Sequence, residues 1–494
     1  MSIYLYIILA YLLILTGFNF YRARRVKTQE DFMLAGRKLK TSVLVFTLIC
    51  TWIGSGTFIA GAELASLAGF SALWMPAGAW LGIIIIYFLA AKIRTFGQYT
   101  IGDILEVRYG PGARVFGAIA IIIAFTAIVS YQFVAGGFIL NVVTDGAISD
   151  STGIIIAAIF VILFTAVGGM VAVAYTDLPN GIIIVLACLL ATPFVYLAAG
   201  GLPQAHQVLD PGHFAVFNPG HEAFPVAYPV LKFVGYFLAT MFLLMGVQGM
   251  YQKFYSARTP KDAKKAVMLW TIGTIFIETV VVVIAVFSYS YFKDDINLTI
   301  PKEGGKVVLM AAKFLVPAPV GVLLLGAACA VVISTGMNYL LSPTTTIMHD
   351  LYQRFKKKEP AQRTLVAGQK VLVTIIGVIA FFLALGLKSV LGMAIFAYTI
   401  YGVAITPALI AALVWKRATK AGGLTSIISG TTICIVLRII VEILPPDKAP
   451  GGDPWGIPII FPALILSIGS LIVVSLLTKK PKAEQLEKFF PEKK

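Results

Sequence analysis

The sequence predicts an all-α polytopic membrane protein that crosses the bilayer with about thirteen helices. Of its 494 residues, 59% are hydrophobic and 13% are charged, whereas soluble domains carry roughly 25% charged residues. Apolar runs long enough to span a bilayer follow one another along nearly the whole chain. Lys and Arg gather in alternate connecting segments, which is the pattern that orients helices in a membrane.

The thirteen runs are joined by short polar segments, apart from two long connections. The runs lie at residues 3–20, 42–68, 71–92, 115–142, 152–168, 178–200, 229–250, 266–291, 318–347, 366–386, 388–414, 424–444 and 457–478. The long connections are 201–228, which holds three of the four histidines, and 293–317, whose apolar part predicts a short helix. We interpret these histidines as part of a solvated loop and not as ligands.

The basic residues predict the orientation of the chain. If the N-terminus lies outside the cell, 31 of the 39 Lys and Arg fall on the cytoplasmic side. They lie in residues 21–41, 92–114, 253–265, 354–370, 416–420 and 479–494. The net charge of +16 then reflects topology and contact with anionic lipid at the inner face of the cell membrane, and not nucleic-acid binding. The C-terminal tail, 479–494, is predicted to be a disordered cytoplasmic segment.

Other sequence features exclude several classes of protein. The four cysteines lie in apolar runs, so neither a disulfide framework nor a metal-ligand spacing is expected. The run at 3–20 has no basic n-region and no small-residue cleavage site, which predicts a retained helix and not a signal peptide. No nucleophile–base pair or phosphate-binding loop is present, so the chain is not predicted to be an enzyme.

The run at 42–68 is interrupted at its centre by the sequence Trp52-Ile53-Gly54-Ser55-Gly56-Thr57. Glycine weakens a helix, and hydrocarbon cannot satisfy the backbone groups that a break releases. A break at this depth must therefore be packed in protein or line a cavity, and secondary transporters build substrate and ion sites from such breaks. The alternative is that the small residues only allow another helix to pack closely.

Three polar groups in other apolar runs are candidates for an ion site. Asp177 lies two residues before Pro179, where Asp177 or Thr176 could cap a helix. Asp177 could also be a membrane-embedded carboxylate beside a cation, and both roles could hold at once. Ser334 and Thr335 are adjacent hydroxyls that share a helix face with Val331. Oxygen ligands suit a hard cation such as sodium, although these hydroxyls could also bond to their own helix.

Glu278 lies near the middle of the apolar run at 266–291. A carboxylate at this depth is costly and is by default a functional candidate. It could carry a proton as a coupling carboxylate or pair with an ammonium group of a solute; the alternative is a hydrogen bond inside the helix bundle. Arg438 and Glu442, four residues apart, are better explained as a structural ion pair.

Six segments, in order, resemble motifs of the sodium:solute symporter family, which includes transporters of proline, pantothenate, sialic acid and glucose. The segments are TQEDFMLAGRKL, TIGDILEVRYG, GGMVAVAYTDLPN, GVQGMYQKFYSARTPKDAKKA, VVISTGMNYLLSPTTTIMHDLY and VWKRATKAGG. The resemblance implies a single membrane transport domain with a LeuT-type fold. Its inverted repeats of five helices would be 42–200 and 229–414, with a leading helix at 3–20 and two trailing helices at 424–478.

The resemblance also implies a sodium site and a sodium-coupled symport mechanism of alternating access. The ligands would be the carbonyls of Cys50, Ile53 and Val331 and the hydroxyls of Ser334 and Thr335. Asp177 would support this site, or a second sodium as in some relatives. Relatives with two sodium ions carry a hydroxyl in place of Val331, so this residue weighs against a second sodium.

The resemblance implies a solute site beside the break. The candidates are Trp52, Gly54, Ser55, Gly56, Thr57, Trp74, Tyr131, Gln132, Gln248, Tyr398 and Thr399. Amides at the start of the second half-helix favour a carboxylate-bearing amino acid or organic acid over a neutral sugar. Trp52 stands where the proline transporters carry an acidic residue, which weighs against proline.

Three alternatives stay open at this point. A carrier of the same fold could use Glu278 or Asp177 for proton coupling, or the solute could be a sugar or a sialic acid. The third alternative is a transporter-like sensor, which the short tail disfavours because some relatives carry a fused signalling kinase. A monomer is sufficient for each of these functions, and the sequence specifies neither the solute nor the oligomeric state.

Overall fold

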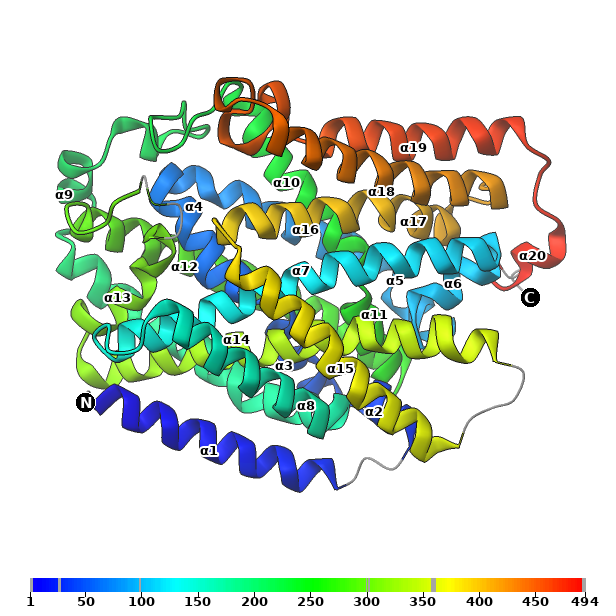
Figure 1. Ribbon diagram of the computed structural model, residues 1–494, viewed down its shortest axis with the longest axis horizontal. Coiled ribbons are helices and arrows are strands. Elements are labelled where there is room, and N and C mark those ends of the chain that lie inside the picture. Colours follow the sequence, from blue (N-terminus) through cyan, green and yellow to red (C-terminus); the bar gives the residue numbers. More distant parts are fainter. Residues whose placement is uncertain are drawn as a thin grey trace.

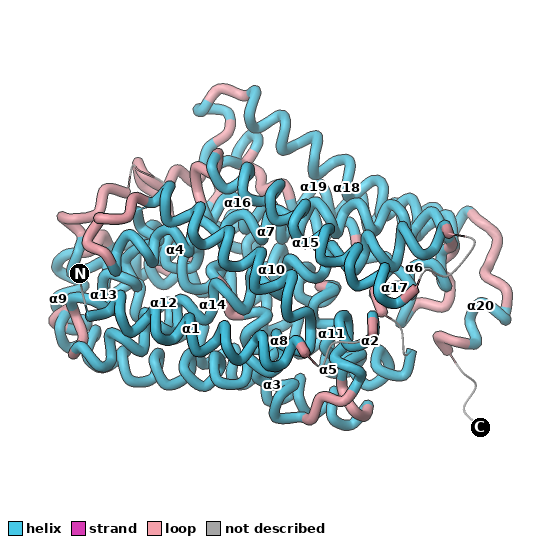
Figure 2. Tube along the Cα trace, turned by 60° about the horizontal axis from the view of Figure 1, so that its bottom comes forward, coloured by secondary structure: helices cyan, strands magenta, loops and turns pink. Residues whose placement is uncertain are grey.

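The computed structural model describes residues 3–24, 28–96, 99–298, 300, 303–356 and 361–490. These residues fold into helices and connecting loops, with no strand, and the loops gather at the two ends of the bundle (Figure 2). Twelve helical segments in the described ranges are long and apolar enough to cross a membrane. The prediction of an all-α polytopic protein is therefore confirmed.

The twelve segments correspond to thirteen passes because one of them, Gly56–Phe96, reverses direction. The reversal separates α4 (Gly61–Ala68) from α5 (Trp74–Phe96) at Gly69, which has a φ of +63°. A Cβ atom here would lie 2.1 Å from the carbonyl oxygen of His213, so the turn requires glycine. The short helix α3 (Thr41–Trp52) and α4 are two halves of one interrupted pass.

The remaining helices fall into long and short groups. The long ones, including broken pairs, are α1 (Ile3–Ala23), α7 (Pro111–Val143), α8 (Asp150–Ala198), α10 (Pro229–Gly246), α11 (Gln248–Ser256), α12 (Pro260–Phe292), α14 (Ala318–Thr345), α15 (Gln362–Leu385), α16 (Val390–Ala404), α17 (Thr406–Val414), α18 (Lys420–Ile443) and α19 (Ile460–Leu477). The short ones are α2 (Gln29–Leu34), α6 (Ile101–Tyr109), α9 (Gly201–Val208), α13 (Val307–Phe314) and α20 (Ala483–Glu487). Helix α13 confirms the short helix predicted in the connection 293–317.

The long helices run between two ends of the molecule, at the left and the right of Figure 1. We call them the Ile3 end, where α1 begins and α9 and α13 lie, and the Phe490 end, where α6 and α20 lie. Helices α1 and α18–α19 flank opposite sides of the bundle (Figure 1). Within one apolar 18-residue stretch of each span, 22% of residues are buried in Tyr4–Tyr21 and in Lys420–Ile443, against 89% in Val390–Val414. The leading and trailing helices are therefore peripheral, and the broken pair α16–α17 is central.

Two sequence expectations are corrected by the helix boundaries. The runs 152–168 and 178–200 are the two helical parts of α8, which meet at a kink at Gly169 (φ +56°, ψ −164°), and the second part begins several residues before Asp177. Asp177 therefore lies within a helix and does not cap one, so the cap interpretation is wrong. The expectation of a disordered tail is wrong for residues 479–490, because α20 forms there and the Phe489 side chain is fully buried.

Candidate functional site

Two spans are broken near the middle of the bundle. Helix α3 ends at Trp52, Ile53 is extended (φ −69°, ψ 99°), and the chain resumes as a π-helical turn over Gly56–Ala60 before α4. Helices α10 and α11 are separated by Val247, which is also extended (φ −66°, ψ 119°). The break between α3 and α4 was predicted from its glycines and is confirmed. A third break, at Ile405 between α16 and α17, was not predicted.

The break in α3 packs directly against the paired hydroxyls of α14. Thr335 Oγ1 donates to the carbonyl oxygens of Cys50 (2.9 Å) and Ile53 (3.2 Å), and Ser334 Oγ lies 3.4 Å from the Cys50 carbonyl. A Cβ atom on Gly54 would lie 2.7 Å from Thr335 Cγ2, so glycine is needed for this close approach. The hydroxyls therefore bond to another helix, contrary to the alternative that they bond only to their own.

Asp177 of α8 joins this cluster from a third helix. Its carboxylate accepts hydrogen bonds from Thr47 of α3 and Ser334 of α14, and its side chain is fully buried. Oxygen atoms from three helices therefore converge, with one carboxylate among them. This donor set is the one that a hard cation such as sodium prefers.

A second layer of polar groups surrounds the cluster. Asn338 Nδ2 donates to the Ser334 carbonyl (2.9 Å), and Lys253 Nζ of α11 donates to Asn338 Oδ1. Val331, the remaining predicted ligand, is fully buried on α14 one turn before the hydroxyls. It lies four residues before Thr335 in the same helix, so its carbonyl faces the backbone amide of Thr335.

Five of the solute-site candidates meet on the other side of the break. The hydroxyls of Tyr131 and Tyr398 lie 3.3 Å apart, and a Cβ atom on Gly56 would lie 2.2 Å from the Tyr398 hydroxyl. Gln132 Oε1 accepts from the Ser55 amide (3.2 Å). Side chains of α7 and α16 therefore cover the non-helical backbone of the break.

Glu278 lies beside this group and contacts two more candidates. Its Oε1 accepts from Trp52 Nε1 (2.9 Å) and from the Thr57 hydroxyl (3.3 Å), and its Oε2 accepts from Trp80 Nε1 (2.8 Å). Trp80 of α5 was not among the predicted site residues. The one feature of the sequence that could have identified Trp80 is its indole in the middle of an apolar run, because a buried indole N–H needs a hydrogen-bond acceptor.

Three predicted solute residues lie elsewhere. Trp74 donates to the Val216 carbonyl (2.9 Å) and stacks on Phe217, in the long connection at the Ile3 end. Gln248 donates to the hydroxyl of Thr346 (2.7 Å) and so ties α11 to the end of α14. Thr399 lines a cavity near the Ile3 end and not the break itself.

That cavity has a volume of about 890 Å³ and lies among α4, α10, α16, α18 and α19. Its lining includes charged groups as well as apolar ones, among them Glu63 of α4. Glu63 accepts from the Ser389 hydroxyl (2.5 Å) and the Leu391 amide (3.1 Å), and so links α4 to the first turn of α16. Thr399, which lines this cavity, directly follows Tyr398 in α16.

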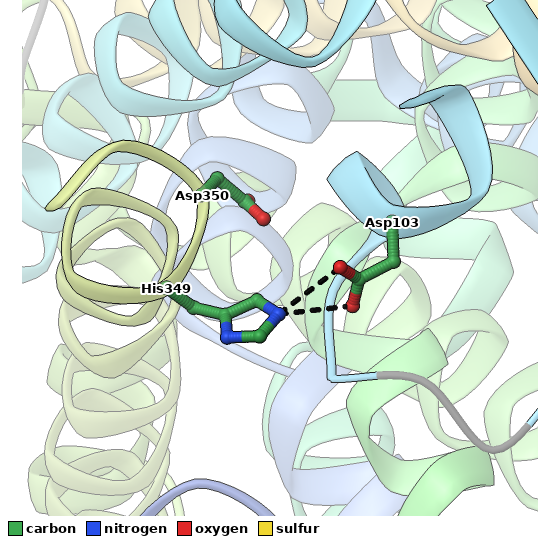
Figure 3. Close-up of side chains that lie close together, drawn as sticks. All are labelled: Asp103, His349 and Asp350. Carbon is green, nitrogen blue, oxygen red and sulfur yellow. Dashed lines mark hydrogen bonds and ion pairs between the residues drawn. The ribbon is translucent and has the colours of Figure 1, made fainter. Parts of the chain in front are cut away.

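A separate charged cluster lies near the Phe490 end. Asp103, His349 and Asp350 place their ligand atoms within 4.8 Å of one another, and His349 Nε2 faces both oxygens of Asp103 at 3.0 and 3.2 Å (Figure 3). Arg114 donates to Asp103 and Glu106 and, through Nε, to Asp350 (3.0 Å). The guanidinium supplies the positive charge that a metal would supply, so this is an ion-pair network.

The charges of this network determine the ionisation of Asp103 at its edge. Burial alone would raise the pKa of Asp103, but the hydrogen bond and charge of His349 and the charge of Arg114 lower that pKa to about 2. Asp103 is therefore ionised at any physiological pH. The network fixes α6 and α7 to the end of the α14 span.

Comparisons with known proteins agree with this architecture. Residues 32–430 match the sodium:solute symporter family. The sodium/proline symporter of Escherichia coli (strain K12) is 25% identical over 493 residues, which cover 97% of this chain and 93% of that protein. The osmoregulated proline transporter OpuE of Bacillus subtilis (strain 168) is 26% identical over 480 residues, covering 94% and 92%.

Solved structures share the fold at low identity. A substrate-bound, outward-open Na+-coupled sialic acid symporter is similar with a TM-score of 0.78 and 15% identity, covering 98% of this chain and 99% of that one. Mhp1, a nucleobase-cation-symport-1 family transporter in a closed conformation, gives a TM-score of 0.60 at 13% identity, covering 93% and 97%. The LeuT-type fold is thus confirmed.

The family match covers far more than half of the chain, and it is a family of transporters and not of enzymes. Two spans broken at mid-bundle beside converging oxygen atoms are consistent with such a transporter. The chain therefore belongs to the sodium:solute symporter family, as a multi-pass plasma-membrane protein that couples the movement of a small solute to sodium.

Proposed function

We propose that this symporter imports a carboxylate-bearing amino acid or organic acid and binds its coupling sodium where α3 breaks against α14. The ligands are the carbonyls of Cys50, Ile53 and Val331 and the hydroxyls of Ser334 and Thr335, with Asp177 in support. The observation that carries the proposal is the convergence of the two hydroxyls on the Cys50 and Ile53 carbonyls.

Sodium bound at this position would favour the conformation that accepts the solute. It would join the broken pass α3–α4 to α14 by electrostatic attraction and stabilise a state open to the Ile3 end. Solute would then enter beside Gly56 and Tyr398, and the helices would rock to open the Phe490 end. Each sodium that moves inward gains about 2.3 kcal/mol per 100 mV of membrane potential, so one sodium is enough for strong accumulation.

The orientation that fits this cycle has the N-terminus outside and the C-terminus in the cytoplasm. The Phe490 end then carries the basic segments and contacts the anionic inner leaflet. The proposed solute site lies at the break, where the amides of the second half-helix favour a carboxylate. A monomer is sufficient for this mechanism.

A ligand screen of the purified full-length protein tests the proposal. Thermal unfolding is followed in detergent with amino acids, short organic acids, sugars and sialic acids, each in sodium and in potassium. Because ligands that bind the native state raise its apparent stability, a shift with an amino acid or organic acid only in sodium supports the proposal. Proline is the first amino acid to test, since the relatives named above are proline transporters.

A second candidate function is a proton-coupled carrier of the same fold. The observation that favours it is the buried Glu278 carboxylate, which has only neutral hydrogen-bond donors around it in the described structure. A proton-coupled carrier should show the same ligand-induced shift of the unfolding midpoint in potassium as in sodium, and its uptake should depend steeply on pH. Sodium-dependent shifts for sugars alone would contradict the carboxylate-bearing solute but leave sodium coupling intact.

A further inference from the structure

Glu278 of α12 is a carboxylate whose charge the described structure does not balance. Its side chain is 3% exposed, and the residues described around it provide no ion pair for it. Its three hydrogen-bond donors, Trp52, Trp80 and Thr57, are all neutral. Buried acidic side chains are normally paired, because an unpaired buried charge is strongly unfavourable.

The hydrogen bonds around Glu278 orient it as an acceptor. Oε1 receives two donors and Oε2 receives one, and an ionised carboxylate offers about four acceptor positions. One position on Oε2 therefore remains for a further donor. The two indoles come from α3 and α5, so three helices hold the carboxylate in a fixed direction.

The position of Glu278 ties it to the proposed solute site. Trp52 and Thr57 stand on the two sides of the break in α3–α4, and the ring of Trp52 lies 6.3 Å from that of Tyr398. Trp52, Thr57 and Tyr398 keep 7–9% exposure although they lie inside the bundle, so they border unfilled space. The faces of Trp and Tyr rings attract a cation, which adds to the attraction of the carboxylate.

We propose that Glu278 binds a positively charged nitrogen on the transported solute, so that the site selects an amino-bearing solute and rejects a simple organic acid. This inference rests on the proposed solute site at the break and narrows its substrate class to zwitterions. The carboxylate of such a solute faces the backbone amides after the break, and its ammonium group faces Glu278, Trp52 and Tyr398. The site thus offers positive amide dipoles to the carboxylate of the solute and a negative carboxylate to its ammonium group.

The test compares amino acids with the amine-free acids of the same carbon skeleton. The pairs are L-proline and cyclopentanecarboxylate, L-alanine and propionate, and L-phenylalanine and 3-phenylpropionate. Thermal shifts of the wild-type protein are measured with each compound in sodium. We expect at least one amino acid to shift the midpoint while its amine-free partner has an apparent Kd at least about tenfold weaker. Equal shifts within every pair, or none for any amino acid, would overturn the inference.

Substitutions then test whether Glu278 causes the preference for amino acids over their amine-free partners. In Glu278→Gln the advantage of the amino acid over its partner should disappear, whereas Glu278→Asp should retain a preference because it keeps the charge. Glu484→Gln removes an exposed carboxylate on α20, at the Phe490 end, and should leave the preference unchanged. Persistence of the full preference in Glu278→Gln would contradict the inference, and the paired compounds test it in the wild-type protein even if that variant does not fold.

The sodium measurement distinguishes failure of this inference from failure of the proposed function. Stabilisation by sodium alone reports on the Ser334–Thr335 site and should survive in Glu278→Gln. If sodium-dependent shifts occur for amine-free acids as strongly as for amino acids, the symporter proposal stands and the Glu278 inference fails. If amino acids shift the midpoint equally in potassium, the proposed sodium coupling fails instead.

Discussion

At the scale of single residues, the candidate sodium site depends on how closely two backbones approach. Gly54 and Thr335 are in contact because glycine has no Cβ, and this contact brings the Thr335 hydroxyl to the Cys50 and Ile53 carbonyls. The carbonyls are available because Ile53 leaves the helical conformation. Removing the hydroxyls should therefore weaken sodium binding by loss of ligands, and replacing the glycine should weaken it by forcing the two helices apart.

The hydroxyls can be removed together in Ser334→Ala/Thr335→Ala. We expect the sodium concentration for half-maximal uptake to rise at least about tenfold, because two oxygen ligands are lost. The measurement is sodium activation of solute uptake in proteoliposomes. Thr335→Ser is the matched control, since it keeps a hydroxyl at the position. Unchanged sodium activation in the double variant would refute the site assignment.

The close approach can be blocked in Gly54→Ala. The added Cβ would lie 2.7 Å from Thr335 Cγ2, and overpacking of this kind costs typically 1–3 kcal/mol. We expect a lower unfolding midpoint and a loss of stabilisation by sodium in a thermal melt. Gly17→Ala on α1, where nothing lies within 4 Å of the added atom, is the control and should behave as wild type. Full sodium stabilisation of Gly54→Ala would show that the contact is not needed for the ion.

At the scale of helices, Asp177 and Phe489 each connect elements that the sequence separates. Asp177 links α8 to α3 and α14 through Thr47 and Ser334. Phe489, just after α20, lies 5.0 Å from the ring of Phe96 at the end of α5. The first connection lies beside the proposed ion, whereas the second holds the chain terminus against the Phe490 end.

Asp177→Asn tests the first connection. The amide keeps the size of the side chain but removes the negative charge, so we expect greatly impaired sodium-driven accumulation in proteoliposomes. Sodium-independent exchange of solute, measured in parallel, should be less affected because the carboxylate does not contact the proposed solute residues in the described structure. Wild-type accumulation in Asp177→Asn would mean that Asp177 has only a structural role.

Phe489→Ala tests the second connection. Loss of a fully buried aromatic side chain should release the tail, because truncating a core Phe costs about 3–5 kcal/mol. Trypsin should then cleave after Lys488 at least about tenfold faster, as followed by mass spectrometry. Substitution of the exposed Glu484 by Ala is the control. An equal cleavage rate in Phe489→Ala and wild type would contradict stable docking of α20.

At the scale of the whole molecule, the two ends of the bundle differ in charge and in architecture. The Ile3 end carries the long connections, α9 and α13 and the cavity near Thr399, whereas the Phe490 end carries the Arg114 network and the docked tail (Figure 1). Alternating access requires each end to open in turn. The proposed orientation assigns the first end to the outside of the cell.

Cysteine labelling tests this orientation, since all four native cysteines are buried. A membrane-impermeant maleimide added to intact cells should label Val216→Cys, at an exposed position of the connection 201–228. Lys482→Cys should react only after the membrane is permeabilised. The reverse pattern would place the N-terminus in the cytoplasm and require import to begin at the Phe490 end.

The sequence by itself determined the membrane class, the number of passes and the position of the break after α3. These features follow from composition and from short-range pattern: a pass needs a continuous apolar run, and a helix weakens at Gly54 and Gly56 wherever it is packed. The break at Ile405 was missed although a signal was visible: Pro407 lies inside the predicted run 388–414, and a proline within a helix kinks or breaks it.

The tertiary structure decided which polar groups meet. Glu278, Trp52 and Trp80 lie on three helices, and Asp177 is separated from Ser334 by 157 residues, so no local pattern could pair them. For the same reason, local sequence could not show that Trp74 contacts a loop and that Gln248 contacts the end of α14. Both were reasonable solute-site candidates by their positions along their helices. The face that a helix presents depends on its rotation against its neighbours, and that rotation is set by packing across the whole bundle.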